Sequence, residues 1–371
     1  MINTSTMKTS DFATVGDRSA PVPPHLELEQ VGPIAASTHG LDVQSASTLG
    51  GEWASNARLD LADGSRRMFK AVGARDADHA EQLRTRLEWR SSLARTSAAA
   101  GLPAALPEPC LAGGDVAIVE HDGATLLVVV SEWMPGVPLA EYHPTRLNAA
   151  STRREIGRAA AEMVEALSTH PAPQEDIQHE WAFETMSETI RGALGTDAGR
   201  TGISETDRSC VEGLITRFEA LREVVLAAPH GLTHHDFNDF NLLVDPETGH
   251  LTGVVDFDDA RLAPLLSEVS IAAAYATLGA DVDPLAALRD VVDGASEVRA
   301  WSDEEVSAIF AGAAVRLCLN AVVWTVRAEG HNATYGAARM ARTWPVVRLL
   351  AAAQTEAAAD GLHRAAAGRA E

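Results

Sequence analysis

The chain has 371 residues, 46% of them hydrophobic, which is enough for a large two-lobed protein with a buried core. Asp and Glu number 52 against 30 Lys and Arg, and the formal charge of -22 repels nucleic-acid backbones and anionic lipids. No apolar run approaches the roughly 18 residues of a membrane span, and the three cysteines lack CxxC spacing. We therefore expect a cytoplasmic protein with neither a nucleic-acid nor a membrane partner.

Residues 1–24 end in a proline-rich stretch, lack periodicity and are expected to form a flexible segment. Strand-like patterns follow, separated by hairpin-type turns such as Ala62-Asp63-Gly64-Ser65 and His121-Asp122-Gly123. The four strands are expected at 57–61, 67–72, 116–120 and 125–130. Helix formers with apolar spacing over 77–95 predict one helix between the two hairpins. Residues 25–133 are thus predicted to be a small β-rich lobe.

The period then becomes helical, and residues 134–350 are predicted to form a larger, mainly helical lobe. One exception is a short hairpin expected at 242–244 and 251–257. The pair Ser302 and Glu305 predicts a capping box, and Pro345 is expected in the first turn of a further helix. Residues 351–371 are expected to be an alanine-rich tail. The fold class is therefore α+β, with two lobes.

One polar stretch carries the chemistry. His234-x-Asp236-x-x-x-x-Asn241 precedes the predicted hairpin, and Asp256-Phe257-Asp258 closes it, in the order that phosphotransferases use. Phosphoryl transfer requires an oriented acceptor hydroxyl and neutralised phosphate charge. We expect Asp236 to act as the base and Asn241 and Asp256 to bind Mg²⁺, which prefers few protein oxygens alongside phosphate oxygens.

Two other interpretations of this stretch deserve weight. His234, His235 and Asp236 resemble a zinc cluster, but adjacent loop residues point in different directions, so a zinc hydrolase is the weaker hypothesis. Each polar residue taken alone is more often a turn former or a cap. The combined spacing and order of these residues favour the phosphotransferase interpretation over separate turn formers or caps. Asp239 is expected to be a solvated loop residue.

A cation for the nucleotide phosphates is expected upstream. Lys70 lies inside the second predicted strand, where an inward charge needs a partner. Glu88 on the following helix is the expected partner and Glu81 the fallback. A loop with Gly50 and Gly51 could cover the phosphates, although a glycine pair is a weak signal. The segment at Glu132 and Met134 is expected to bind the purine base through its backbone.

From about residue 40 to 350 the chain resembles the aminoglycoside phosphotransferase and choline kinase superfamily, which has a protein-kinase-like fold. The narrower likeness, through HHDFNDFNLLV, TGVVDFDD and SEVSIAAAYATLG, is to hydroxylysine kinases. The resemblance implies that Asp236 is the catalytic base, that Asn241 and Asp256 hold Mg²⁺, and that Lys70 pairs with Glu88. It also implies that Glu268 and His234 brace the catalytic loop.

Two positions depart from the family pattern. Glycine is common where His235 stands, and we expect His235 to point away from the metals and to hydrogen-bond locally. Trp181-Ala182-Phe183 occupies a region where related kinases often have Trp-Asp-Leu, so acceptor contacts are in doubt. Arg316 and Arg327 are candidate partners for an acceptor carboxylate.

The expected function is transfer of the γ-phosphate of ATP or GTP to a hydroxyl of an amino alcohol or a hydroxylysine-like amino acid. Aminoglycosides, choline and homoserine are alternative acceptors. A nucleotide-binding pseudokinase is the rival from another class, although all four of Lys70, Asp236, Asn241 and Asp256 are present. The sequence leaves the acceptor, the nucleotide base and the oligomeric state open.

Overall fold

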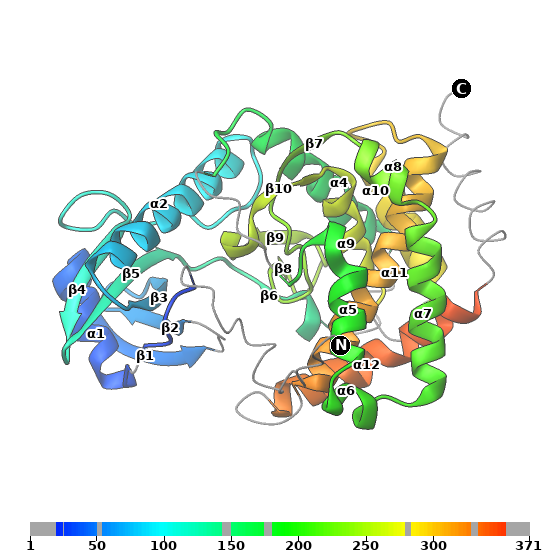
Figure 1. The fold of residues 1–371 in the computed structure, drawn as a ribbon. Helices are drawn as coiled ribbons and strands as arrows, with labels where there is room; N and C mark the ends of the chain where they lie inside the picture. Colours follow the sequence, from blue (N-terminus) through cyan, green and yellow to red (C-terminus); the bar gives the residue numbers. More distant parts are fainter. Residues whose placement is uncertain are drawn as a thin grey trace. The chain divides into compact units, whose positions relative to one another are not determined.

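The computed structural model describes residues 20–24, 26–49, 54–142, 150–173, 180–278, 283–327 and 333–353. The chain forms two compact units (Figure 1). The first, here called the sheet unit, comprises the described residues within 16–135 and 252–258, and the second, the helical unit, comprises the described residues within 136–251 and 259–371. The fold is mixed α+β, with a sheet-rich N-terminal region and a helical C-terminal region, as predicted.

The sheet unit is built on a five-stranded antiparallel sheet with the order β1-β2-β3-β5-β4. Its elements are α1 (Leu28–His39), β1 (Val43–Leu49), β2 (Ser55–Leu61), β3 (Arg66–Ala74), α2 (Ala77–Ala99), β4 (Val116–His121) and β5 (Ala124–Glu132). Both predicted hairpins are present. In the second, Asp122 and Gly123 adopt the positive φ angles that a tight turn between twisted strands requires.

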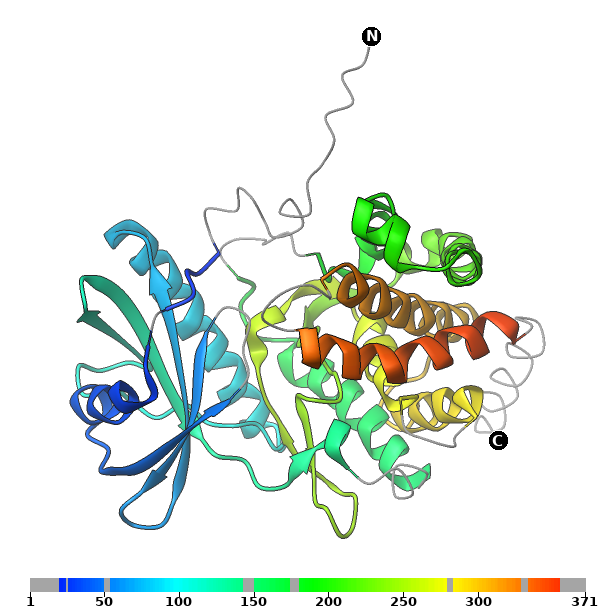
Figure 2. The ribbon, with the colours of Figure 1, turned by 90° about the horizontal axis from the view of Figure 1, so that it is seen from below.

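The two helices of the sheet unit cover opposite faces of the sheet (Figure 2). Ile34 of α1 belongs to the core on one face with Phe69 and Ala71 of β3, whereas Leu83 of α2 belongs to the core on the other face. Side chains alternate along a strand, so Lys70 lies on the α2 face. This places the lysine next to the helix that was expected to supply its partner.

Helix α1 was not predicted from the sequence. Pro33 lies inside it, and proline removes a helical N–H and disfavours helix interiors. The helix nevertheless buries Val31, Ile34 and Ala35 against the sheet and ends at Gly40, whose φ of 70° is left-handed. Burial of this apolar face therefore outweighs the local effect of the proline.

The helical unit holds most of the helices and several short strands. Its elements are β6 (Val137–Pro138), η2 (Leu139–Glu141), α4 (Ala150–Leu167), η3 (Phe183–Thr185), α5 (Met186–Leu194), α6 (Asp197–Gly202), α7 (Glu205–Glu219), α8 (Arg222–Ala227), β7 (His230–Thr233), β8 (Leu242–Val244), β10 (Arg261–Pro264), α9 (Leu266–Ala276), α10 (Pro284–Ala295), α11 (Asp303–Val326) and α12 (Ala333–Ala352). β9 (Leu251–Val254) and η4 (Phe257–Asp259) span the boundaries of the 252–258 segment. The strands predicted after residue 241 are thus present.

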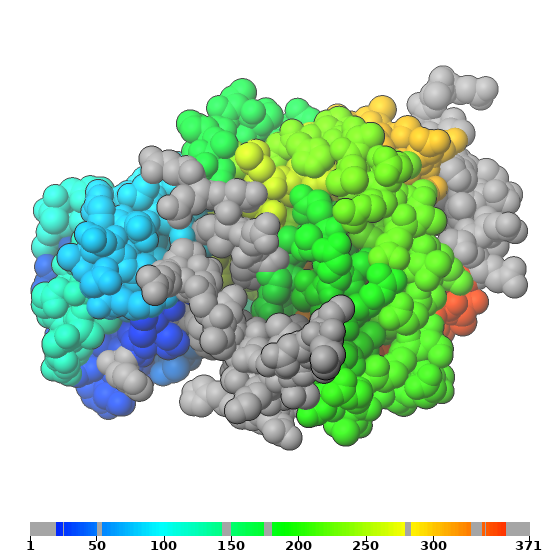
Figure 3. All heavy atoms as spheres, in the orientation of Figure 1, coloured from blue at the N-terminus to red at the C-terminus, as the bar shows by residue number. Residues whose placement is uncertain are grey.

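The core of the helical unit is organised around α11, which packs against α5, α7, α9 and α12. Figure 2 shows α11 and α12 side by side, and α7 lies at the surface in Figure 3. The predicted capping box at Ser302 and Glu305 is present. By length and composition α11 could cross a membrane, contrary to the sequence expectation, but 94% of its apolar window is buried inside the protein.

The predicted start of the last helix is wrong. Pro345 lies inside α12, which begins at Ala333, twelve residues before the proline. The burial of Val347 and Leu350 beyond Pro345 provides the packing that keeps the helix continuous across it. Most of the predicted alanine-rich tail lies outside the described residues.

Candidate active site

The loop between β7 and β8 carries Asp236, and a tight internal turn shapes it. The side-chain oxygen of Asn238 accepts hydrogen bonds from the backbone N–H groups of Phe240 (2.7 Å) and Asn241 (3.2 Å). Asparagine favours such turns because its short side chain mimics a backbone acceptor. The turn brings the amides of Asn238 and Asn241 to the same carboxylate.

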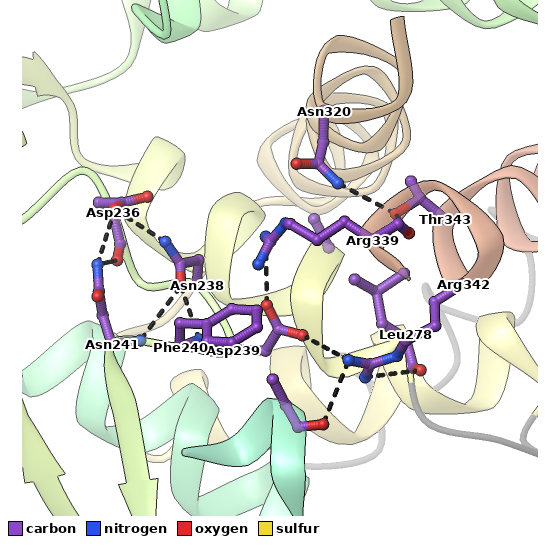
Figure 4. Close-up of polar contacts among 12 residues, drawn as sticks. Asp236, Asn238, Asp239, Phe240, Asn241, Leu278, Asn320, Arg339, Arg342 and Thr343 are labelled. Carbon is purple, nitrogen blue, oxygen red and sulfur yellow. Dashed lines mark hydrogen bonds and ion pairs between the residues drawn. The ribbon is translucent and has the colours of Figure 1, made fainter. Parts of the chain in front are cut away.

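Three side chains hold the carboxylate of Asp236. Its Oδ2 accepts from Nδ2 of Asn238 at 2.8 Å and from Nδ2 of Asn241 at 2.7 Å (Figure 4). Its Oδ1 accepts from Nη2 of Arg316 at 3.1 Å. The side chain of Asp236 is still 20% exposed, so it is both fixed and accessible.

The surroundings of Asp236 change its acidity. Burial and the nearby carboxylate of Asp259 raise its pKa to about 6, against the opposing effects of Arg316 and Asn238. A carboxylate with this pKa is ionised at neutral pH, and it is more basic than an ordinary aspartate. Both properties suit a group that receives a proton.

His235 occupies a strained backbone position that glycine would adopt more easily. Its φ of 66° lies in the left-handed region, which costs a non-glycine residue about 1 kcal/mol or more. The imidazole is buried, accepts from the N–H of Phe183 at 3.3 Å and lies 3.2 Å from the hydroxyl of Thr233. These contacts confirm that His235 bonds locally and compensate for its strained backbone.

His234 is also used inside the loop. Its Nδ1 accepts from the N–H of Asp236 at 3.3 Å, and its ring packs edge-on against Phe237. Both histidines therefore contribute ring nitrogens to hydrogen bonds within the protein. In the part of the chain that the structure describes, no three His, Cys, Asp or Glu side chains are grouped as metal ligands.

Glu268 braces the loop from α9, as the resemblance implied. Its Oε2 accepts from the backbone N–H of His235 at 2.9 Å, and the residue is fully buried. Burial, with the charge of Asp236, raises the pKa of Glu268 to about 8 against the effects of this hydrogen bond and of Arg316. Glu268 is therefore mostly protonated at pH 7 and adds little negative charge beside Asp236.

Asp239 is not the solvated residue that the sequence suggested. It is 2% exposed and lies between Nη2 of Arg339 and Nη1 of Arg342, each 3.3 Å from one carboxylate oxygen (Figure 4). Arg339 also lies over the ring of Phe240. Both arginines belong to α12, about a hundred residues later in the chain. The last helix therefore anchors the loop that carries Asp236.

The sheet unit contains a second charged cluster, centred on Lys70. Its Nζ donates to Oδ1 of Asp256 at 3.1 Å and to Oδ2 of Asp258 at 2.5 Å. Burial of Lys70 opposes its charge, but the two carboxylates outweigh burial and raise its pKa above the ordinary value. Asp256 has a left-handed φ of 66°, and strained residues of this kind are frequent at functional sites.

The predicted ion pair between Lys70 and Glu88 is wrong. Among the described residues, Lys70 pairs with Asp256 and Asp258. Glu88 accepts from the backbone N–H groups of Asp115 and Val116 and so caps the start of β4. From α2 it is Arg90 that reaches the cluster, with Nη1 3.3 Å from Oδ1 of Asp258. The fallback, Glu81, bonds Arg84 on the same helix.

The segment expected to hold the purine base begins at the end of β5. Glu132 ends this strand, and its N–H donates to the carbonyl of Leu106 at 2.9 Å. Met134 follows two residues later and is half-buried. The loop with Gly50 and Gly51 lies outside the described residues.

Comparison with known proteins identifies the family. The model of the phosphotransferase enzyme family (APH) matches residues 46–301, more than half of the chain. The chain belongs to the phosphotransferase enzyme family. It is therefore a phosphotransferase, although a search of curated protein sequences gave no match. The matched segment of this APH phosphotransferase includes both the Lys70 cluster and the loop of Asp236.

Solved structures share the fold of this APH phosphotransferase. An aminoglycoside phosphotransferase from Alicyclobacillus acidocaldarius is 16% identical with a TM-score of 0.62, covering 92% of this chain and 98% of its own. An amicoumacin kinase in complex with AMP-PNP, Ca²⁺ and Ami is 15% identical (TM-score 0.61; 87% and 93% covered). A microcompartment-associated aminopropanol kinase is 16% identical (TM-score 0.60; 86% and 96% covered). These likenesses establish a kinase-like fold.

Several residues of the two clusters were missed in the sequence. Neither Asp258 nor Arg90 was predicted to join the Lys70 cluster. Arg316 was one of two candidate partners for an acceptor carboxylate, and its contact with Asp236 was not predicted. A cation within the buried apolar stretch of α11 was the available signal, because a buried charge needs a partner.

Proposed function

We propose that the protein is a small-molecule kinase that transfers the γ-phosphate of ATP or GTP to a hydroxyl of an amino alcohol or a hydroxylysine-like amino acid. The observation that carries the proposal is the carboxylate of Asp236, fixed by three donors yet partly accessible, with a pKa of about 6. It fits a base that orients a hydroxyl and receives its proton. Asp236 is the proposed catalytic residue.

In the proposed reaction the acceptor oxygen forms a bond to the γ-phosphorus as the bond to the β-phosphate oxygen breaks. The nucleoside diphosphate leaves, and the hydroxyl proton passes to Asp236. Lys70 would neutralise phosphate charge, because its raised pKa keeps it cationic at every physiological pH. The backbone at Glu132 and Met134 would hold the purine, and Glu88 would act indirectly by fixing α2.

The proposed Mg²⁺ ligands are Asn241 and Asp256. The Nδ2 of Asn241 donates to Asp236, so the planar amide turns its oxygen away from that carboxylate. The side chain of Asp256 is 45% exposed and has an ionised lysine beside it. Hard oxygen donors of this kind suit Mg²⁺, which when bound would neutralise charge on the phosphates.

The acceptor class is the finer part of the proposal. Among the similar structures are an aminopropanol kinase and aminoglycoside kinases, which supports an acceptor that carries amino and hydroxyl groups. Both arginines considered for an acceptor carboxylate are engaged within the protein. Arg316 bonds Asp236, and Nη2 of Arg327 lies 2.5 Å from Oε1 of Glu180. These contacts favour an amino alcohol over an amino acid, in a cytoplasm that supplies the nucleotide.

Release of nucleoside diphosphate tests the function directly. ATP and GTP should each be assayed with aminopropanol, ethanolamine, choline, homoserine, hydroxylysine and an aminoglycoside, with Asp236→Asn as the control. We expect acceptor-dependent release above the control with at least one amino alcohol. Nucleotide binding without acceptor-dependent release would instead support the pseudokinase, and turnover that needs Zn²⁺ but no nucleotide would support the hydrolase.

A further inference from the structure

Asp239 lies in the middle of the turn that runs from Asp236 to Asn241, and its side chain is buried. Among the described residues, its ion-pair partners are Arg339 and Arg342 of α12, each with one guanidinium nitrogen 3.3 Å from a carboxylate oxygen. A carboxylate removed from water needs cationic partners close by. The position of the turn therefore depends on where α12 places these two arginines.

Arg339 contacts the turn through a ring face as well as through charge. Its side chain is 7% exposed, and its guanidinium lies 4.8 Å from the ring centre of Phe240 and 5.4 Å from that of Tyr275 on α9. A planar guanidinium can stack on aromatic rings while its edge faces a carboxylate. Arg339 therefore holds two consecutive residues of the turn, Asp239 and Phe240, beside α9.

Arg342 divides its contacts among several segments. Its Nη1 donates to the carbonyl of Ala140 at 3.3 Å, and its Nη2 donates to the carbonyl of Leu278 at 3.1 Å (Figure 4). The N–H of Ala140 in turn donates to the carbonyl of Asp239 at 2.7 Å. Arg342 thus joins α12 to the surroundings of the turn, whereas Arg339 packs on the turn itself.

The two residues held from α12 lie between the amides that bind Asp236. Asn238 precedes Asp239, Asn241 follows Phe240, and both amides donate to Oδ2 of Asp236. The backbone N–H of Phe240 also donates to Oδ1 of Asn238, at 2.7 Å. A shift of Asp239 and Phe240 would therefore move both amides and the carboxylate that they hold.

We propose that Arg339 is a positioning residue that holds the turn from Asp236 to Asn241 in the geometry needed for phosphoryl transfer. The proposal rests on the proposed function, which assigns Asp236 the role of base and Asn241 that of a metal ligand. An arginine that only stabilised α12 would leave kcat of the folded protein unchanged when replaced. A positioning arginine lowers kcat as well, because a small misplacement of catalytic groups can slow a reaction by about 10²-fold.

Arg348→Met is the matched control. Arg348 also lies on α12, and it pairs with Asp207 of α7 through two contacts of 2.7 and 3.0 Å. The side chain of Asp207 is 10% exposed, so this substitution also takes a cation from a carboxylate that is largely shielded from water. Neither residue belongs to the turn. We expect Arg348→Met to lose stability and to keep kcat.

The first measurement needs neither acceptor nor nucleotide. Hydrogen exchange of the backbone N–H groups of Phe240 and Asn241, which both donate to Oδ1 of Asn238, is compared in wild type, Arg339→Met, Arg339→Lys and Arg348→Met. We expect exchange to be faster by about tenfold or more in Arg339→Met than in Arg348→Met. The increase should be smaller in Arg339→Lys, which keeps the charge but lacks the planar face. If Arg339→Met does not fold, Arg339→Lys decides the matter.

The second measurement is kcat and the KM for ATP at saturating Mg²⁺, with the acceptor that gives the highest wild-type rate. We expect kcat to fall by about 10 to 10²-fold in Arg339→Met, with KM for ATP within about threefold, and both to be retained in Arg348→Met. Exchange no faster than in Arg348→Met, or an unchanged kcat, overturns the positioning role. Absence of turnover in wild type overturns the proposed function, while the exchange comparison still decides whether Arg339 fixes the turn.

Discussion

Asp258 in the sheet unit and Asp236 in the helical unit are two aspartates beside cations, yet their acidities move in opposite directions. Burial opposes the charge of Asp258, but Arg90 and Lys70 outweigh it and hold its pKa well below the usual range. At Asp236, burial and Asp259 outweigh Arg316, and the pKa rises to about 6. Two cations produce a permanent anion, whereas one cation opposed by another carboxylate leaves a group that can exchange a proton.

This contrast assigns different work to the two clusters. A permanently charged Lys70–Asp258–Arg90 network suits a fixed electrostatic frame for phosphates and metal. A carboxylate that titrates near pH 6 suits proton transfer. The two clusters should therefore respond differently to substitution and to pH.

The largest effect is expected from Asp236→Asn. The amide retains the size of the side chain but cannot take up a proton, so kcat should fall by about 10² to 10⁴-fold. The measurement is nucleoside diphosphate release with the acceptor that gives the highest wild-type rate in the release assay. Asp245→Asn, in the exposed turn after β8, is the control and should retain activity. A fall of less than about threefold in Asp236→Asn would mean that Asp236 is not the base.

Lys70→Met tests the charged cluster of the sheet unit. The variant loses the cation next to Asp256 and Asp258, and we expect kcat/KM to fall by roughly 10²-fold with weaker nucleotide binding. The pKa of Asp258 should rise, because one of its two cations is gone. Arg66→Met, on the same strand but paired with Asp60 at the surface, is the control. An unchanged Km for ATP and unchanged kcat would exclude Lys70 from phosphate binding.

The next largest effect is expected in the pH dependence of the wild-type rate. Asp236 must be ionised to accept a proton, so its active fraction falls as the pH drops through its pKa of about 6. We expect kcat/KM to decrease by about tenfold per pH unit below that value. Asp258 has no part in this limb, since its pKa lies well below the range. A rate that is level down to pH 5 would contradict the elevated pKa of Asp236.

Glu268→Gln should change the pH dependence of stability. In the fold the pKa of Glu268 is about 8, above its usual 4.5, so between these values the native state holds a proton that the unfolded chain has lost. Rising pH therefore lowers the free energy of unfolding in this window, by up to about 1.4 kcal/mol per unit. Glutamine does not titrate, and denaturant titrations from pH 5 to 8 should show a smaller slope. An identical slope in the two proteins would contradict the prediction.

The features that could be predicted from the sequence are those set by residues close to one another in the chain. The hairpins around Asp63 and Asp122, the capping box at Ser302 and the spacing of Asp236 and Asn241 are all set by local patterns. The partners of the charged residues were not predictable in this way. Lys70 and Asp258 are 188 residues apart, and Arg316 and Asp236 are 80 apart, so only the folded chain shows which pairs form.

Burial was the second property that the sequence could not supply. Asp239 was expected to be solvated because loop aspartates usually are, but Arg339 and Arg342 of α12 enclose it. Glu88 was expected to face Lys70, yet two backbone N–H groups at the start of β4 take its carboxylate. In both cases the residue type indicated a need for partners, and tertiary packing decided which partners.

The smallest effect is expected from His235→Gly. Glycine would relieve the left-handed backbone, a gain of about 1 kcal/mol, but it would also remove the imidazole contacts with Phe183 and Thr233. These contributions have opposite signs and similar size, so the free energy of unfolding should change by less than about 1 kcal/mol. The N–H bond of residue 235 to Glu268, which braces the loop of Asp236, is a backbone bond that glycine retains, so kcat should stay within a few-fold. Loss of activity in a normally folded His235→Gly protein would show that the imidazole acts on Asp236. The difference between Asp236 and Asp258 would then depend on His235 as well as on the charged groups beside each carboxylate.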